Sequence, residues 1–297
     1  MFRFTGFLVA GLVLVGAIGR FSPAEAEATG AAVQRPFLMF DATLYKNKPS
    51  FTGYPLRPIT LLYESRLLPN DRSRTAVPLE PTIRAIANDL SKTSGPVIVD
   101  IERWPVRGEM STVQATIDKF VSVLSWMRSE APNVSIGVYS TIPIRDYWRA
   151  IRGPSHKDYH AWQRENDRLD GIVAQVDALF PSIYTFYPDR QGWVTYAVAQ
   201  LREARRKANG KPVYAFLWPQ YHESNRELGH RHLDADYWEI QLNTVAQHAD
   251  GVVIWGGVGK HGPEPWNEAA PWWQVTKRFM RHINSDSPDR PNSLPIH

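Results

Sequence analysis

Short apolar runs alternate with stretches of helical spacing through most of this sequence, and this alternation constrains the fold more than any other feature. The apolar runs lie at 37–41, 58–63, 96–102, 134–139, 177–184, 212–218 and 251–256, and helical spacing is found at 79–92, 111–130, 143–176, 194–207 and 234–248. Continuous apolar runs are typical of parallel strands that helices cover on both faces. The pattern therefore predicts an α/β fold, a TIM-like (β/α) barrel with seven or eight parallel strands. An open doubly wound sheet is the alternative, although no glycine-rich phosphate loop follows any run.

The N-terminal 28 residues have the features of a secretory signal peptide. Arg3 precedes an apolar run at 7–19, and small residues allow cleavage after Ala26 or Ala28. An apolar run of about thirteen residues is shorter than a membrane-spanning helix requires. An uncleaved anchor is the alternative, since Arg20 follows the run directly. We therefore expect a periplasmic or secreted protein with no membrane partner after cleavage.

The remainder of the chain predicts one domain and a short tail. A mature chain of about 270 residues suits a single large α/β domain, which we place at 36–283. Residues 284–297 are rich in Pro, Ser and Asn, so we expect a disordered tail. The sequence specifies no oligomeric state.

The composition excludes several kinds of site. Cys is absent, so the fold has neither disulfides nor thiolate metal ligands. The net charge of +4 permits an acidic polysaccharide ligand but is shared by many globular proteins. His222, Glu223, His230 and His232 lack the spacing of a zinc motif, and we interpret them as a polar surface loop. The basic segment 202–207 is interpreted as a solvated helix end. We predict no metal, no cofactor and no nucleic-acid partner.

Two carboxylates close the run at 96–102 and are the main candidates for catalysis. Asp100 and Glu102 are two residues apart, so on a strand both side chains would point to the same face. Their Cα atoms would then lie about 6.6 Å apart. The C-terminal ends of parallel strands carry the active sites of α/β barrels. A structural role, as a helix cap or a salt-bridge partner, is the alternative.

Further polar and aromatic residues stand at or just after the ends of the predicted strands. With the two carboxylates, the candidates are Asp41, Asp100, Glu102, Arg103, Tyr139, Tyr184, Tyr187, Trp218 and Trp255. Aromatic faces stack on sugar rings and carboxyl groups protonate glycosidic oxygens, so this set predicts a polysaccharide site. For Tyr187 and Trp218, core packing is an equal alternative, and Asp41 could instead cap a helix or pair with a cation. The glycines at 256 and 257 follow Trp255, where missing side chains would leave room for a ligand.

Three strings lie at or near these strand ends: Asp-x-Glu-x-Trp at 100–104, Leu-Phe-Pro-Ser-Ile-Tyr at 179–184 and Val-Ile-Trp-Gly at 253–256. Together with the segments 58–66, 137–139, 168–170 and 212–215, they resemble, in the same order, segments of the hyaluronidase family of glycoside hydrolases. The resemblance covers most of the mature chain. It implies a distorted barrel and an endo-acting hydrolase that cleaves a β-linked N-acetylhexosamine polysaccharide, such as a glycosaminoglycan, with retention.

The resemblance also implies a role for each matched residue. Glu102 would be the proton donor, and Asp100 would orient the substrate's acetamido group, whose carbonyl oxygen is the nucleophile. The acetamido pocket would be lined by Tyr139, Tyr184 and Trp255. Such substrate assistance removes the need for an opposing carboxylate, although Asp41 or Glu223 could supply one. Glu102 must stay protonated near neutral pH, for which we expect an apolar pocket or a charged Asp100 beside it.

The sequence departs from the family in ways that bear on the substrate. Animal members have disulfides, and the chain is shorter than theirs between the acidic motif and the run at 134–139. The family's Trp-Arg-Pro becomes Trp-Pro-Val at 104–106, and Phe216 and Trp218 stand where Tyr and Arg are expected. Hyaluronan is therefore one candidate substrate among several. A chitinase-like or cell-wall glycan hydrolase and a non-catalytic glycan-binding barrel are the alternatives.

Overall fold

The computed structural model describes residues 36–69 and 76–285 of the 297-residue chain. The predicted signal peptide at 1–28 lies outside the described residues, as does the predicted tail from 286 onward. Residues 284 and 285, which we assigned to that tail, belong to the last helix.

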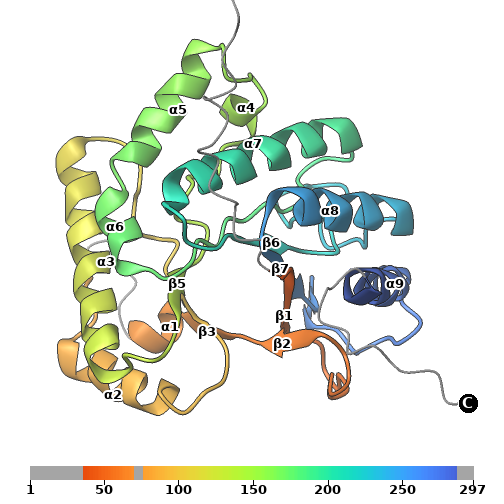
Figure 1. Cartoon of the computed structure of the whole chain (residues 1–297), viewed down its shortest axis with the longest axis horizontal. Helices are drawn as coiled ribbons and strands as arrows, with labels where there is room; N and C mark the ends of the chain where they lie inside the picture. Colours follow the sequence, from red (N-terminus) through yellow and green to blue (C-terminus); the bar gives the residue numbers. More distant parts are fainter. Residues whose placement is uncertain (1–35, 70–75, 286–297) are drawn as a thin grey trace, which may run out of the picture. The chain divides into compact units, whose positions relative to one another are not determined.

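Seven strands lie in the middle of the described fold and pair in parallel (Figure 1). They are β1 (Leu38–Thr43), β2 (Leu56–Pro58), β3 (Thr60–Tyr63), β4 (Val97–Asp100), β5 (Ile136–Val138), β6 (Tyr214–Leu217) and β7 (Gly251–Gly256). They form two sheets, ordered β2-β1-β7-β6 and β3-β4-β5. β2 and β3 are one extended run interrupted at Ile59, so this run contributes to both sheets. A separate antiparallel pair, β8 (Val258–Gly259) and β9 (Gly262–Pro263), follows β7.

The segment 177–185 occupies the place of a strand between β5 and β6. We predicted a strand at 177–184, and the structure shows isolated parallel bridges there, Tyr139 with Phe180 and Leu179 with Val213. Pro181 has no N–H to donate to a ladder, which explains the interruption. The parallel order confirms the predicted (β/α) barrel, but within the described residues its hydrogen-bonded ladder is not closed.

Helices lie to the left of, above and to the right of the strands in Figure 1. They are α1 (Glu64–Leu67), α2 (Glu80–Leu90), α3 (Met110–Glu130), α4 (Tyr147–Ala150), α5 (Lys157–Asp167), α6 (Asp170–Gln175), α7 (Arg190–Ala208), α8 (Ala235–His248) and α9 (Pro271–Ser285). The predicted helical stretch at 143–176 is thus divided into α4, α5 and α6. We did not predict α9, which packs against α8 through Trp272 and Trp238, whose ring centroids are 6.4 Å apart.

The strands separate two hydrophobic clusters, because successive side chains point to opposite faces. On β4, Val97 and Val99 pack in the outer cluster with the helices, whereas Ile98 packs in the inner one. The inner cluster also contains Phe40 of β1 and Phe216 of β6. Asp100 is two residues beyond Ile98, so the same alternation directs its side chain toward the interior of the barrel.

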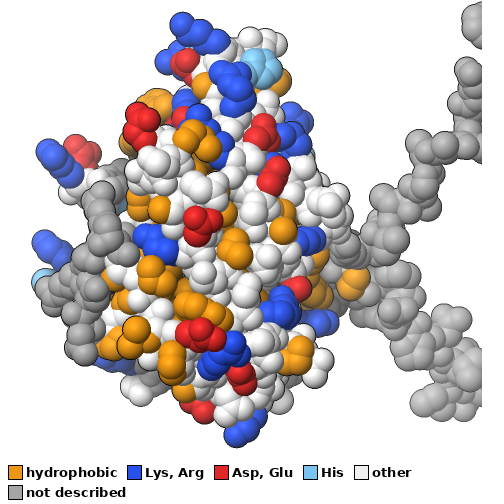
Figure 2. Space-filling model, turned by 90° about the vertical axis from the view of Figure 1, so that its left-hand side faces the viewer, with side chains coloured by type: hydrophobic (Ala, Val, Ile, Leu, Met, Phe, Trp, Pro, Cys, Tyr) orange, Lys and Arg blue, Asp and Glu red, His pale blue; other side chains and the backbone are white. Residues whose placement is uncertain are grey.

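The face of the fold on which α2 and α3 lie carries acidic and basic side chains interspersed with apolar ones (Figure 2). This face therefore has no continuous basic stripe of the kind that binds nucleic acid. Among the described residues, no helix combines the length and apolar character needed to cross a membrane.

Candidate functional site

A cavity of about 390 Å³ lies at the C-terminal ends of the strands. It is lined by Leu61, Tyr63, Glu64, Ser65, Asp100, Glu102, Tyr139, Arg145, Tyr184, Phe216, Trp218, His222, Glu223 and Trp255. A smaller cavity of about 180 Å³ adjoins it, and Glu102, Tyr139 and Arg145 line both. The two cavities are therefore contiguous, with Glu102 at their boundary.

The two candidate carboxylates line the larger cavity from different local structures. Asp100 is the last residue of β4, whereas Glu102 lies in the following turn with 58% of its side chain exposed. Our prediction that both stand on one strand is wrong for Glu102, since β4 ends two residues earlier. Its Oε2 is 3.9 Å from Nη2 of Arg145, a long ion pair between two residues that line both cavities.

Burial raises the pKa of Asp100 from 3.8 to about 7. The loss of hydration is the largest cause, and the negative charges of Glu102 and Glu64 add to it. We expected the retained proton on Glu102, the proposed acid. In the unbound site the raised pKa instead keeps a proton on Asp100 up to about pH 7.

Aromatic rings form one wall of the cavity. Tyr184 and Trp255 stack with ring centroids 5.8 Å apart, and Trp218 meets Trp255 edge to face at 4.7 Å. The indole of Trp255 is oriented by Tyr63, whose hydroxyl accepts its Nε1–H at 3.1 Å. Trp218 is almost fully buried, so it supports Trp255 from behind as well as lining the cavity.

Tyr139 and Tyr184 form a buried hydroxyl pair beside the carboxylates. The rings are 6.2 Å apart, and the Tyr139 hydroxyl donates to Ser182 at 3.2 Å. Burial raises the pKa of both phenols, so both remain neutral hydrogen-bond donors at ordinary pH. Both phenols can therefore contact a polar group of a ligand without adding charge to the cavity.

The glycines after Trp255 do not leave room for a ligand, contrary to our prediction. A Cβ on Gly256 would lie 2.9 Å from Trp218, and one on Gly257 would lie 2.5 Å from the backbone of Tyr45. Both residues also have positive φ values, 145° and 85°. The space beside them is thus filled by the protein's own aromatic side chains, and a ligand has no room there.

Three predicted site residues are not among those lining the cavity. Asp41 binds Lys48 through an ion pair of 2.7 Å, which is the structural alternative we had considered for it. Arg103 binds Glu64, a residue that lines the cavity, through two hydrogen bonds of 2.8 and 2.9 Å. Tyr187 lies outside and is 39% exposed.

Sequence reasoning missed several lining residues. Tyr63 ends the predicted strand at 58–63 and Glu64 follows it directly, so their position at a strand end was an available signal. We interpreted His222 and Glu223 as part of a polar surface loop, with Glu223 also a possible opposing carboxylate, and both line the cavity. Burial, with the charges of Arg145 and His230, lowers the pKa of His222 to about 4, so its ring is neutral. Among the described residues, no group of three or more His, Cys, Asp or Glu could hold a metal ion.

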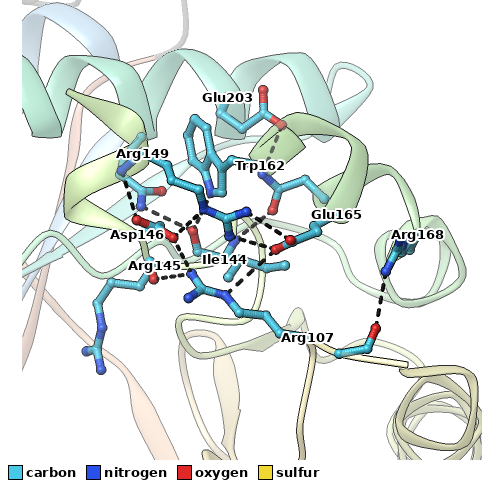
Figure 3. Close-up of polar contacts among 12 residues, drawn as sticks. Arg107, Ile144, Arg145, Asp146, Arg149, Trp162, Glu165, Arg168 and Glu203 are labelled. Carbon is cyan, nitrogen blue, oxygen red and sulfur yellow. Dashed lines mark hydrogen bonds and ion pairs between the residues drawn. The ribbon is translucent and has the colours of Figure 1, made fainter. Parts of the chain in front are cut away.

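A network of ion pairs holds the loop that carries Arg145 (Figure 3). Arg107 donates to the Arg145 main-chain oxygen at 2.6 Å and lies 3.2 Å from Asp146. Arg149 binds Asp146 at 2.6 Å and Glu165 at 2.7 and 2.8 Å. Since Arg107 belongs to the loop after β4, the network ties the loop of Glu102 to the loop of Arg145.

Comparison with solved structures finds similar folds in bee venom hyaluronidase. One structure superposes with a TM-score of 0.58 at 16% sequence identity, covering 84% of this chain and 97% of that chain. Another, in complex with a hyaluronic acid tetramer, gives a TM-score of 0.56 at 14% identity and covers 84% of this chain and 96% of that chain. The sequence matches neither a protein-family model nor a curated protein. The likeness establishes the fold alone, a TIM-like (β/α) barrel.

Proposed function

We propose that this protein is a glycoside hydrolase that cleaves an N-acetylhexosamine polysaccharide internally with retention. The observation that carries the proposal is one cavity in which Asp100 and Glu102 lie with Tyr139, Tyr184 and Trp255. Carboxyl groups beside aromatic faces are the groups that glycosidic hydrolysis requires. The similarity in fold to bee venom hyaluronidase supports this class of reaction.

In this proposal Glu102 protonates the leaving oxygen. It lines both cavities, so an oxygen that joins one sugar in the larger cavity to the next sugar in the smaller one would lie within its reach. Sugars on both sides of the cleaved bond are expected of an endo-acting enzyme. Trp255 would stack against the ring in the larger cavity.

In this proposal, binding of the glycan moves a proton from Asp100 to Glu102. The raised pKa lets Asp100 keep its proton up to about pH 7 in the unbound site. A substrate amide that donates its N–H to Asp100 favours the ionised form of that carboxyl. The glycan also removes water from Glu102, which disfavours its charge. Both effects transfer the proton to Glu102, where the leaving oxygen needs it.

The bond changes then follow in two steps. The acetamido carbonyl oxygen attacks the anomeric carbon while the glycosidic C–O bond breaks and Glu102 gives its proton to the leaving sugar. The resulting cyclic oxazolinium ion is stabilised by the carboxylate of Asp100. Glu102, now ionised, takes a proton from water, which opens the ring from the opposite face and restores the original configuration.

A second candidate mechanism uses Glu223 in place of the substrate's own amide. Glu223 lines the cavity, so it is available as an opposing carboxylate, whereas Asp41 is not. In that case Glu223 would act as nucleophile or general base, and the N-acetyl group would be dispensable.

Reducing-end release from hyaluronan, chondroitin and chitin oligosaccharides tests these proposals. We expect Glu102→Gln to abolish release, and Glu109→Gln, an exposed glutamate outside the cavity, to leave it unchanged. Under substrate assistance Glu223→Gln keeps its activity and N-deacetylated chitin oligosaccharides resist cleavage. Loss of activity in Glu223→Gln with cleavage of the deacetylated substrate would favour the second mechanism. No release from any glycan would refute the enzyme proposal.

We also propose that the N-terminal segment directs export. Its charged start, apolar run and small residues at 24, 26 and 28 support this. N-terminal sequencing of the protein from periplasm and medium should begin at residue 27 or 29. A chain that retains Met1 would refute cleavage at either position.

A further inference from the structure

Aromatic side chains continue from the cavity to the surface of the protein. His222 lines the cavity, and its ring centroid is 4.8 Å from that of Phe186. Tyr187 follows Phe186 in the chain, and its ring lies 5.6 Å from that of Trp148. Trp148 and Tyr187, here called the outer platform, are 60% and 39% exposed. The path of rings therefore ends in two large aromatic side chains that face solvent.

The outer platform is held firmly from beneath. The ring of Tyr147 lies 5.1 Å from both Trp148 and Tyr187. Tyr147 itself packs at 5.1 Å against Tyr196 of α7, which is fully buried. Because packing already fixes these rings, a ligand that stacks on them would lose little free energy in ordering them.

We propose that the outer platform binds sugar rings of the same glycan beyond the cavity, an inference that rests on the proposed function. A polysaccharide cleaved internally extends beyond a cavity of about 390 Å³, and the rings continue from that cavity. Arg145 lines the cavity, its guanidinium lies 5.5 Å from the centroid of Phe186, and it offers donors to sugar hydroxyls. Exposed aromatic rings stack well on the apolar faces of pyranoses.

A protein partner fits these observations less well. Trp and Tyr are common at protein interfaces, but a stable interface buries about 800 Å² on each partner. The outer platform consists of two side chains, which is far less surface. Its continuity with the cavity also favours a ligand that occupies both.

The experiment compares Trp148→Ala, Trp148→Phe and Trp126→Ala with the full-length mature wild type. Trp126, near the C-terminal end of α3, is a partly exposed tryptophan outside the cavity and serves as the control. We measure kcat/KM on the polymer and on the shortest oligosaccharide that the wild type cleaves. We expect Trp148→Ala to lower the ratio of polymer to oligosaccharide kcat/KM by about threefold to tenfold, the loss of one ring contact. Trp148→Phe should restore part of the ratio, and Trp126→Ala should leave it unchanged.

A binding measurement separates this inference from the proposed function. Retention of Glu102→Gln on immobilised hyaluronan, chondroitin and chitin does not require turnover, and we compare it with the Glu102→Gln, Trp148→Ala double variant. Weaker retention of the double variant supports the outer platform even if the wild type cleaves no glycan. Equal retention together with an unchanged ratio overturns the outer platform while the enzyme proposal stands. Failure of both proteins to bind any of the three glycans also overturns it.

Discussion

Replacement of Asp100 by Asn removes a carboxyl group that the fold keeps from ionising. Its pKa of about 7 lies roughly three units above its value of 3.8 outside the fold. Each unit corresponds to about 1.4 kcal/mol, so the ionised carboxylate destabilises the native state by at most about 4 kcal/mol above pH 7. Because Asp100 lines a cavity that solvent can enter, the actual destabilisation is smaller than this upper limit. We therefore expect Asp100→Asn to raise the free energy of unfolding at pH 8 by about 1 to 4 kcal/mol.

The sign of the effect depends on pH. Below pH 4, Asp100 is protonated in both the folded and the unfolded chain, so its ionisation contributes nothing to stability. Between about pH 4 and pH 7 the unfolded chain loses this proton while the folded chain keeps it, and wild-type stability falls as pH rises. The advantage of Asp100→Asn should thus appear across this window and become constant above about pH 7.

Urea unfolding followed by tryptophan fluorescence at several pH values between 4 and 8 measures this difference. Glu109→Gln is the control, because it also replaces a carboxylate by an amide, at an exposed glutamate outside the cavity. A stability difference between Asp100→Asn and the wild type that is the same at pH 5 and pH 8 would refute the reasoning. In the same variant we expect glycan cleavage to fall sharply, because an amide cannot stabilise the oxazolinium ion.

Further predictions concern the aromatic wall, the loop network and a buried carboxylate. Trp255→Phe keeps a ring but loses the hydrogen bond to Tyr63, and we expect kcat/KM to fall about fivefold to tenfold without a change in the pH profile. Arg107→Gln loses the hydrogen bond that holds the Arg145 main chain, so we expect kcat/KM to fall about tenfold. Arg107→Lys should recover part of this kcat/KM. Equal kcat/KM for Arg107→Gln and the wild type would contradict the prediction. Glu203 is almost fully buried and accepts hydrogen bonds from two amides and an arginine, so Glu203→Ala should destabilise the fold by about 3 kcal/mol in urea unfolding.

The strands could be predicted because their signal is local. Each apolar run corresponds to a strand or, at 177–184, to a strand-like segment, and the ends differ by a few residues. Period-two alternation explains why Asp100 lies on the same face of β4 as Ile98, although we used it only to pair Asp100 with Glu102. The exception at 177–184 follows from Pro181, a residue that was visible in the sequence and whose missing N–H we did not weigh.

The last helix was missed although its signal was present. Pro271 begins it, and Trp272, Val275 and Phe279 recur at helical spacing on its buried face. Trp272 stacks on Tyr45 near the end of β1, with ring centroids 5.7 Å apart. Through this contact, the last helix of the domain packs against the segment that follows its first strand.

The positions of His222 and Glu223 could not be predicted in the same way. Their local sequence is polar, and they enter the cavity because the loop folds back on a distant segment. The His222 backbone N–H donates to the Thr185 carbonyl at 2.8 Å, and its ring contacts Phe186. Contacts between residues about 37 positions apart leave no periodic signal in the sequence.

The charge of the cavity bears on the substrate more directly than the charge of the whole chain. Trp218 stands where the resemblance leads us to expect Arg, and it packs against Trp255 as part of the aromatic wall. Of the residues that line the larger cavity, Arg145 is the cation, because the low pKa of His222 keeps its ring neutral. Glu64, Glu102 and Glu223 line the same cavity. The larger cavity thus has no excess of positive charge to attract a polyanion, and an N-acetylhexosamine polymer would be recognised there through its amide and its apolar ring face.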